Sequence, residues 1–314
     1  MKVGSLFTGY GGLDTAVGGE LAWYAEIDKA ACEVLANLYP NVPNLGDITK
    51  IDWTQVEPVD VLTGGYPCQP FSHAGKRKGK NDERHLWPHV RDAIDTLRPE
   101  YAVLENVGGH VTLGFANVLS DLATIGFDAE WGTFRASSVG APHQRKRLFI
   151  IAYPTRGAWG TGSGRSVSES ERATRLATHF SNITSNTHSD GHGEQLHSRR
   201  MARVEEQTKS SAQQREWSRG ESHTGSVVGD WGKYAPVIRQ WELVLNRTAP
   251  TPTVERKDKR RLNPVFVEWM MGLDEGYVTG HGLSAAQELK MLGNGVVPQQ
   301  ARAAVAQLME RIPA

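Results

Sequence analysis

Short apolar runs alternate with stretches of helical periodicity over the first half of the chain. Runs typical of strands occupy residues 2–7, 21–27, 59–65, 101–107, 128–134 and 147–153. Between them, apolar positions recur every three or four residues over residues 12–20, 29–38, 88–97 and 115–124. This alternation predicts an α/β fold with a mostly parallel sheet and helices on both faces. Because such sheets bind ligands at the carboxyl ends of their strands, the loops after Phe7, Gly65 and Asn106 are candidate site loops.

The chain changes character after Pro154. Residues 155–230 are rich in Ser, Thr, Gly, Arg and His and poor in aliphatic side chains, so this segment cannot bury much core alone. Helical patterns return over residues 263–273 and 298–312, and Ser284 with Gln287 forms a capping-box pattern. We therefore expect three parts. These are a domain over 1–153, a partly irregular insertion over 154–262, and C-terminal helices over 263–314 that pack back on the first domain.

Charge is balanced overall but unevenly distributed. The whole chain has 35 Lys and Arg and 35 Asp and Glu, whereas residues 153–262 carry 18 basic against 12 acidic residues. Net charge alone argues neither for nor against a polyanionic partner, but its distribution marks a basic insertion on an acidic body.

The two cysteines, Cys32 and Cys68, form neither a disulfide framework nor a zinc motif, so we expect no bound metal. No apolar run approaches the roughly 20 residues that cross a bilayer. The N-terminus lacks a signal-peptide pattern, and we expect a cytoplasmic protein.

A glycine-rich loop, FTGYGG at residues 7–12, follows the first strand and opens the first helix. Glycines there let a ligand approach the backbone, although a simple tight turn would have the same pattern. Glu26 and Asp28 end the second strand, where a carboxylate can accept hydrogen bonds from ribose hydroxyls. Asp47 could take up an adenine amino group. Each acid could instead be a surface residue or a helix N-cap, and we expect the latter for Asp28.

Cys68 and Glu105 follow two strands that would end at the same edge. Cys68 lies between prolines and is followed by Lys and Arg residues, which favour a thiolate. This setting suits a nucleophile, with a structural cysteine in a turn as the alternative. Glu105 comes after an apolar run that would desolvate it and raise its pKa, which makes it a candidate acid.

Three polar residues, Gln144, Arg145 and Arg147, lead into the last apolar strand. The two arginines are two positions apart and would point the same way. Guanidinium groups suit base-edge oxygens and phosphates, while a solvated charge run is the alternative.

Taken in order, these motifs resemble those of the bacterial and phage DNA (cytosine-5) methyltransferases. The resemblance covers residues 3 to about 153 and 260 to 310. It rests on the segments FTGYGG, EID, GGYPCQPFSHAGKR, LENV, QRKRLFIIA, RRLNPVFVEWMMGL and LGNGVVPQQA. It implies the Rossmann-like fold of S-adenosylmethionine-dependent methyltransferases with an inserted target-recognition domain. The implied reaction is methylation of carbon 5 of cytosine in a specific duplex DNA sequence.

The resemblance also implies roles for individual residues. In that family a cysteine thiolate adds to carbon 6 of a flipped-out cytosine, and Cys68 occupies its place. Glu105 would contact and help protonate ring nitrogen 3, and Arg147, with Arg145 beside it, would hold the base and stabilise the adduct. The implied S-adenosylmethionine contacts are Phe7, Gly9, Gly11, Glu26, Ile27, Asp47, Ile48 and Asn294. The implied DNA contacts in the loop after the cysteine are Gln69, Ser72, Lys76, Arg77 and Lys78.

Some positions depart from the family pattern, and some alternatives stay open. Thr8 and Tyr10 replace small residues often found in the first loop, and Gly295 replaces the commoner Ser or Ala after Gly-Asn. The alternatives are a catalytically silent DNA-binding protein, a folate-using enzyme acting on free nucleotides, and an RNA methyltransferase. The intact catalytic set argues against the first, and the first loop with the basic insertion against the second. We expect a monomer. The target sequence and any partner restriction enzyme stay open.

Overall fold

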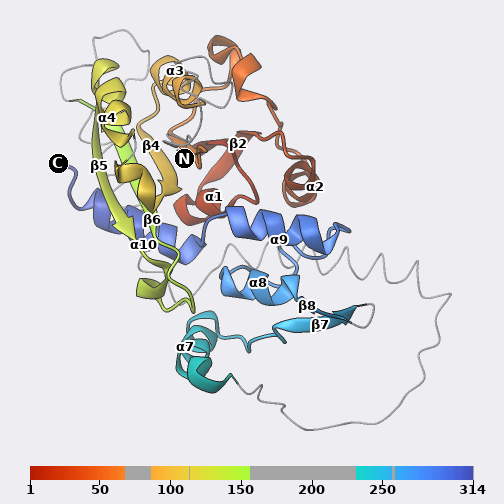
Figure 1. The fold of residues 1–314 in the computed structure, drawn as a ribbon. Helices are drawn as coiled ribbons and strands as arrows, with labels where there is room; N and C mark the ends of the chain where they lie inside the picture. Colours follow the sequence, from red (N-terminus) through yellow and green to blue (C-terminus); the bar gives the residue numbers. More distant parts are fainter. Residues whose placement is uncertain (68–85, 113, 156–230, 257–258, 314) are drawn as a thin grey trace, which may run out of the picture.

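The computed structural model describes residues 1–67, 86–112, 114–155, 231–256 and 259–313. Its centre is a six-stranded sheet with the order β2-β1-β3-β4-β6-β5 (Figure 1). The strands are β1 Lys2–Leu6, β2 Glu20–Ala25, β3 Val61–Gly64, β4 Tyr101–Val107, β5 Phe127–Phe134 and β6 Arg147–Pro154. The pairs β1 with β2, β1 with β3, and β3 with β4 are parallel, while β6 is antiparallel to β4 and β5. The expected mostly parallel sheet is therefore confirmed, with β6 running against its neighbours.

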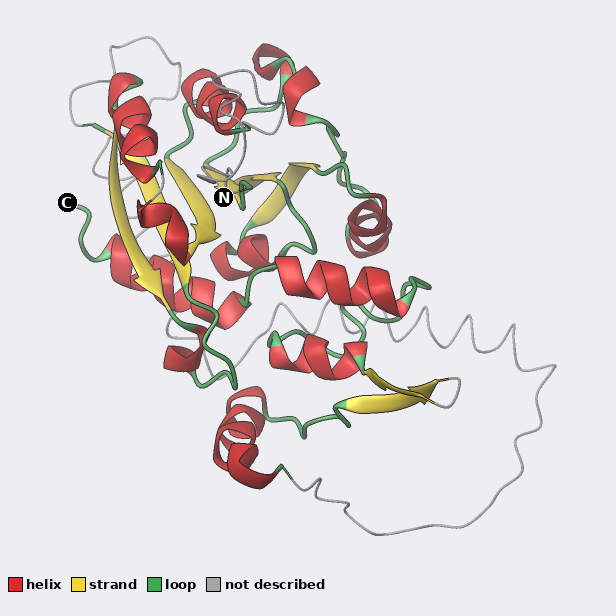
Figure 2. Cartoon of the chain, viewed as in Figure 1, coloured by secondary structure: helices red, strands yellow, loops and turns green. Residues whose placement is uncertain are grey.

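Helices cover both faces of this sheet (Figure 2). The helices in the described residues are α1 Gly12–Val17, α2 Lys29–Leu38, α3 Trp87–Leu97, α4 Phe115–Thr124, α7 Ala235–Leu245, α8 Pro264–Met270, α9 Ala285–Asn294 and α10 Pro298–Met309. Of these, α7 and α8 lie apart from the sheet (Figure 2). Short 3-10 turns lie at Ile48–Lys50, Trp53–Gln55, Gly108–Thr112, Ala136–Val139 and Gly232–Tyr234. None of the helices in the described residues is long and apolar enough to span a membrane.

Side chains alternate along the strands and divide the core into two layers. On one face, Leu62 and Leu104 belong to a cluster that includes residues of α3 and α4. On the other face, Val61 and Val103 pack in a cluster with residues of α1 and α10. The last helix thus covers the same face as the first, which brings the turn before α10 next to the first loop.

A third apolar cluster joins α2, α7, α8 and α9. Ile238 and Trp241 of α7 pack in it with Phe266 and Trp269 of α8. The indole of Trp241 donates a 2.9 Å hydrogen bond to the carbonyl oxygen of Trp269, so this buried polar group is satisfied. The end of the predicted insertion therefore packs against the C-terminal helices.

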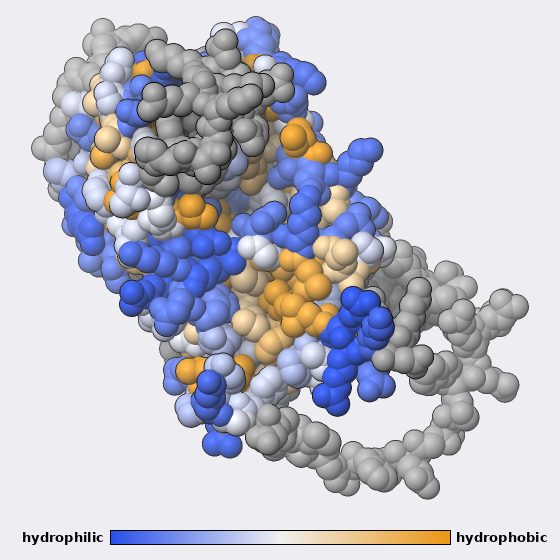
Figure 3. Space-filling view, in the orientation of Figure 1, coloured by the Kyte–Doolittle hydropathy of each residue, from blue (hydrophilic) through white to orange (hydrophobic). Residues whose placement is uncertain are grey.

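A two-stranded antiparallel hairpin precedes α8. It consists of β7 Thr253–Arg256 and β8 Lys259–Leu262, and β8 is exposed along its length. The hairpin lies apart from the main sheet and forms a strongly hydrophilic patch on the face shown in Figure 3.

Candidate functional site

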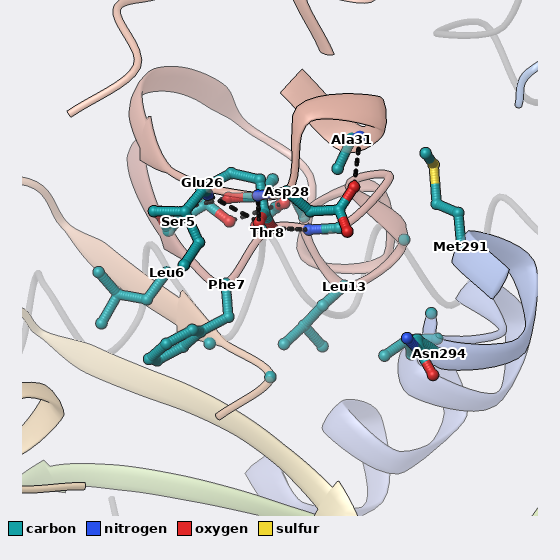
Figure 4. Close-up of a pocket in the computed structure, with 18 of the residues that line it drawn as sticks. Ser5, Leu6, Phe7, Thr8, Leu13, Glu26, Asp28, Ala31, Met291 and Asn294 are labelled. Atoms are coloured by element: carbon teal, nitrogen blue, oxygen red, sulfur yellow. Dashed lines mark hydrogen bonds between the residues drawn. The ribbon is translucent and has the colours of Figure 1, made fainter. Parts of the chain in front are cut away.

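A cavity of about 590 Å³ lies at the carboxyl ends of β1, β2 and β3 (Figure 4). This volume falls within the roughly 300–1,000 Å³ typical of small-molecule sites. The first loop, the loop after β2, the end of β3, and α9 with its following turn form the walls. Among the lining residues are Phe7, Gly9, Asp14, Glu26, Ile27, Asp28, Thr63, Glu105, Lys290 and Asn294.

The first loop turns by means of left-handed backbone conformations. Gly9 and Gly11 have φ of 57° and 81°, which glycine adopts without a steric cost. Phe7 has φ of 52°, an uncommon conformation for an aromatic residue. Its amide donates a 2.9 Å hydrogen bond to the carbonyl oxygen of Ala25, which helps to hold it there. Strained residues of this kind cluster at functional sites, and Phe7 lines the cavity.

Glu26 joins the loops after β1 and β2. Its carboxylate accepts hydrogen bonds of 2.8 Å from each of three backbone amides, those of Gly9, Ile27 and Asp28. Three amide donors fix the carboxylate at the cavity wall, where its remaining lone pairs can meet a ligand's hydroxyl groups. Figure 4 shows Glu26 beside Asp28 in the cavity.

The turn after α9 closes the other side of the cavity. Tyr10 donates a 2.6 Å hydrogen bond to the carbonyl oxygen of Val296, which ties this turn to the first loop. Arg145 donates hydrogen bonds to the carbonyl oxygens of Gly293, at 2.9 Å, and Gly295. These contacts hold Asn294 at the cavity wall.

Glu105 is a buried carboxyl group at the base of the cavity. Its Oε1 pairs with Nε of Arg147 at 2.9 Å, and both side chains are largely buried. Burial raises the pKa of Glu105 to about 7, against the opposing charges of Arg147 and Arg145. Near neutral pH the group is therefore divided between its acid and its base form.

The segment that leads to Cys68 is held against Glu105. A Cβ on Gly65 would lie 3.5 Å from Oε2 of Glu105. Asn106 donates a 3.0 Å hydrogen bond to the carbonyl oxygen of Tyr66, whose ring packs on Trp87 with centroids 5.2 Å apart. The chain thus reaches Pro67 in a fixed position beside the cavity.

Several of the predicted site residues lie outside the described residues. They are Cys68, Gln69, Ser72, Lys76, Arg77 and Lys78.

The predicted cofactor residues divide into two groups. Phe7, Gly9, Glu26, Ile27 and Asn294 line the cavity, whereas Gly11, Asp47 and Ile48 are not among its lining residues.

Asp47 caps the N-terminus of the 3-10 turn Ile48–Lys50. Its carboxylate accepts hydrogen bonds from the amide and the hydroxyl of Thr49, at 3.0 and 2.8 Å, and pairs with Lys50 at 3.2 Å. Ile48 is buried in the apolar cluster below it.

Sequence reasoning missed Asp14, Thr63 and Lys290, which also line the cavity. Asp14 is the most informative of them, because it is a charged residue on the buried side of a short helix. Among the described residues, no group of three or more His, Cys, Asp and Glu side chains is placed to hold a metal ion.

The fold and cavity define the class as a Rossmann-like α/β protein with a cavity at the carboxyl edge of its sheet. The family model of the C-5 cytosine-specific DNA methylases matches residues 1–310. The chain belongs to this family.

Curated relatives match over less than half of the chain. The type II methyltransferase M.NgoBV of Neisseria gonorrhoeae is 36% identical over 143 residues, 42% of this chain and 34% of the relative. The orphan methyltransferase M.SPRI of Bacillus phage SPR is 35% identical over 164 residues, 48% of this chain and 37% of the relative. The matched segment thus spans little more than a third of each relative.

Solved structures match the fold over nearly the whole chain. The Dnmt2 methyltransferase of S. pombe has a TM-score of 0.59 at 16% identity, covering 99% of both chains. The Entamoeba histolytica methyltransferase EhMeth has a TM-score of 0.57 at 15% identity, covering 100% of this chain and 99% of the other. At these identities the likeness concerns the fold.

Proposed function

We propose that this protein methylates carbon 5 of cytosine in duplex DNA, with S-adenosylmethionine as the methyl donor and Cys68 as the nucleophile. The observation that carries the proposal is the family match over residues 1–310, which includes Cys68. The buried Glu105–Arg147 pair at the base of the cavity supports it, because this reaction needs an acid beside the nucleophile.

The cavity residues fit S-adenosylmethionine. A fixed carboxylate at Glu26 suits ribose hydroxyls, the ring of Phe7 offers an apolar surface for adenine, and Asn294 suits the polar methionine end. When bound, the cofactor supplies an electrophilic methyl group. Cofactor contacts for Gly11, Asp47 and Ile48 stay predictions, and each would require a ligand that extends beyond the cavity lining.

In the proposed reaction, the thiolate of Cys68 forms a bond with carbon 6 of a flipped-out cytosine. The protonated form of Glu105 donates to ring nitrogen 3, which neutralises the charge that the addition places on the ring. The electron pair at carbon 5 then takes the methyl group. Loss of the carbon 5 proton to a base, departure of the Cys68 thiolate and return of the proton on ring nitrogen 3 to Glu105 restore the neutral ring and the starting form of the protein. Arg147 holds the Glu105 carboxyl in place for this step.

We assign DNA recognition to two regions, the loop after Cys68 and the insertion, which lie largely outside the described residues. Residues 69–78, with Gln69, Ser72, Lys76, Arg77 and Lys78, would contact the DNA backbone. The insertion over 154–262, which follows the domain 1–153 and precedes the helices 263–314 in the chain, would read the target sequence. We infer a monomer that acts in the cytoplasm.

Mass spectrometry of nucleosides tests this proposal. Unmethylated duplex DNA incubated with the full chain and S-adenosylmethionine should yield 5-methylcytosine, and the Cys68→Ser variant should yield none. Glu105→Gln should slow formation by about 10²–10⁴-fold, the range of a general acid. A Cys68→Ser protein with full activity would overturn the mechanism. The appearance of 5-methylcytosine in RNA of the same sequence, but not in DNA, would overturn the substrate.

A further inference from the structure

One buried carboxylate lines the cavity without a part in the proposed reaction. Asp14 of α1 is 8% exposed. Its two oxygens accept hydrogen bonds from the hydroxyl of Ser5 on β1, at 2.9 Å, and the hydroxyl of Thr63 on β3. All three residues line the cavity.

Asp14 differs in its partners from the other acids of the cavity. Glu26 accepts from three amides, Asp28 pairs with Lys290 at 2.8 Å, and Glu105 pairs with Arg147. Within the described part of the chain, no lysine or arginine forms an ion pair with Asp14. Neutral hydroxyl groups therefore hold its charge.

The titratable groups near Asp14 do not compensate its charge either. Tyr39, at the end of α2, and Tyr277, after α8, hydrogen-bond to each other at 3.4 Å. Burial raises the pKa values of both hydroxyls, and the charge of Asp14 raises them further, so both stay neutral.

This arrangement carries a free-energy cost in the free protein. Burial raises the pKa of Asp14 to about 6, so the carboxyl is ionised at neutral pH although its surroundings disfavour the charge. A neutral residue of the same shape would avoid this cost. A buried charge without a protein cation, exposed to a ligand cavity, is matched by a ligand that brings its own positive charge.

We propose that Asp14 is a specificity-determining residue that favours the cationic sulfonium cofactor over its neutral thioether product. This inference rests on the proposed function. S-adenosylmethionine and S-adenosylhomocysteine share the adenosine and amino acid parts and differ by one methyl group and the sulfonium charge. A carboxylate in a partly desolvated cavity attracts this charge at several ångströms and gains nothing from the product. Asp14 thereby helps product to give way to fresh cofactor.

Calorimetric titration of the full chain with each ligand tests the proposal at pH 7.5. In the Asp14→Asn variant, the ratio of S-adenosylmethionine to S-adenosylhomocysteine affinity should fall by about tenfold. An analogue of the cofactor with a protonated amine in place of the sulfonium should lose affinity for the Asp14→Asn variant as S-adenosylmethionine does. Glu26→Gln is the matched control, because loss of a ribose contact should weaken both ligands equally.

Melting temperature separates this role from a structural one. An asparagine keeps an acceptor for one hydroxyl, and the other hydroxyl can rotate to accept from its amide. Asp14→Asn should therefore melt at the wild-type temperature or above. A strong loss of stability would overturn the proposal, because the charge would then serve the fold.

The pH dependence of the affinity ratio, measured with Asp14 retained, gives a second test. Glu105 lines the same cavity and titrates nearby, so the Glu105→Gln background isolates Asp14. The affinity ratio should fall as pH is lowered through about 6. An affinity ratio that is independent of pH, or unchanged in Asp14→Asn, would overturn the inference alone. A wild-type chain that binds neither ligand would instead overturn the proposed function on which it rests.

Discussion

The ring of Tyr10 occupies the space beside Gly295 that a side chain at position 295 would need. A Cβ atom on Gly295 would overlap the ring of Tyr10, which is fully buried and hydrogen-bonded to Val296. Both residues depart from the pattern that the chain otherwise resembles, in which small residues are common in the first loop and Ser or Ala follows Gly-Asn. The two departures therefore depend on each other, because the tyrosine ring is accommodated only when position 295 has no side chain.

This relationship predicts strong coupling between the two positions. Gly295→Ala should lower the free energy of unfolding by about 1–3 kcal/mol, the usual cost of overpacking. In a Tyr10→Ala background the same substitution should cost little or restore stability, because the new methyl group enters the space left by the ring. Denaturant unfolding of the four proteins measures this coupling.

Gly293→Ala is the matched control, since a Cβ at that position would have no atom within 4 Å apart from its chain neighbours and the backbone of its own helix. It should leave stability nearly unchanged. An equal cost of Gly295→Ala in both backgrounds would contradict the coupling.

The buried pair of Glu105 and Arg147 predicts a pH dependence of turnover. If protonated Glu105 is the acid, the single-turnover rate should fall as pH rises through about 7, its pKa in the free protein. Because the charge of Arg147 lowers this pKa, Arg147→Ala should reduce the rate and move the alkaline limb to higher pH. Rapid-quench measurements from pH 5.5 to 9 provide the profile.

Glu105→Gln serves as the control for this profile, because an amide does not titrate in that range. Its residual rate should lack the limb at pH 7. A limb that persists in this variant would assign the pH dependence to another group.

The sequence predicted the fold well because its signals are local and periodic. Short continuous apolar runs mark the strands, and apolar positions with a period of about 3.6 residues mark the helices between them. Helix starts at Asp28, Asn263 and Ser284 were also readable, since a capping side chain and the amides it meets are neighbours in sequence.

Site residues were less predictable where long-range contacts decide their role. Nothing near Asp14 in the sequence indicates Thr63, and the parallel pairing of β1 with β3 brings this hydroxyl to it. Arg145 was expected to share a strand direction with Arg147, but it precedes β6 with φ of 33°. Its guanidinium therefore reaches the turn after α9, which no local pattern could indicate.

The buried carboxylate of Glu268 in α8 is expected to contribute strongly to stability. It is 1% exposed and accepts hydrogen bonds from the amides of Gly276, Val278 and Thr279 and from the Thr279 hydroxyl, at 2.6–2.8 Å. Glu268→Ala would leave these donors buried without an acceptor, at a cost of about 3–5 kcal/mol in unfolding free energy. Thermal and urea unfolding provide the measurement. Glu275→Ala, an exposed acid in the same loop, should change stability by less than about 0.5 kcal/mol.

The hairpin β7–β8 predicts unequal contributions of its basic residues to DNA binding. Arg260 lies opposite Glu255 in the ladder, whereas Arg261 lies opposite Val254. Successive side chains point to opposite faces, so Lys259 and Arg261 share a face that lacks this acid. If that face meets phosphates, Arg261→Gln should weaken duplex binding and reduce the slope of log affinity against log salt by about 0.9. Arg260→Gln is the matched control and should have the smaller effect, because Glu255 already offsets its charge. Fluorescence anisotropy between 50 and 200 mM salt measures both variants, and equal losses would show that the face bearing Lys259 and Arg261 is not the one that meets DNA.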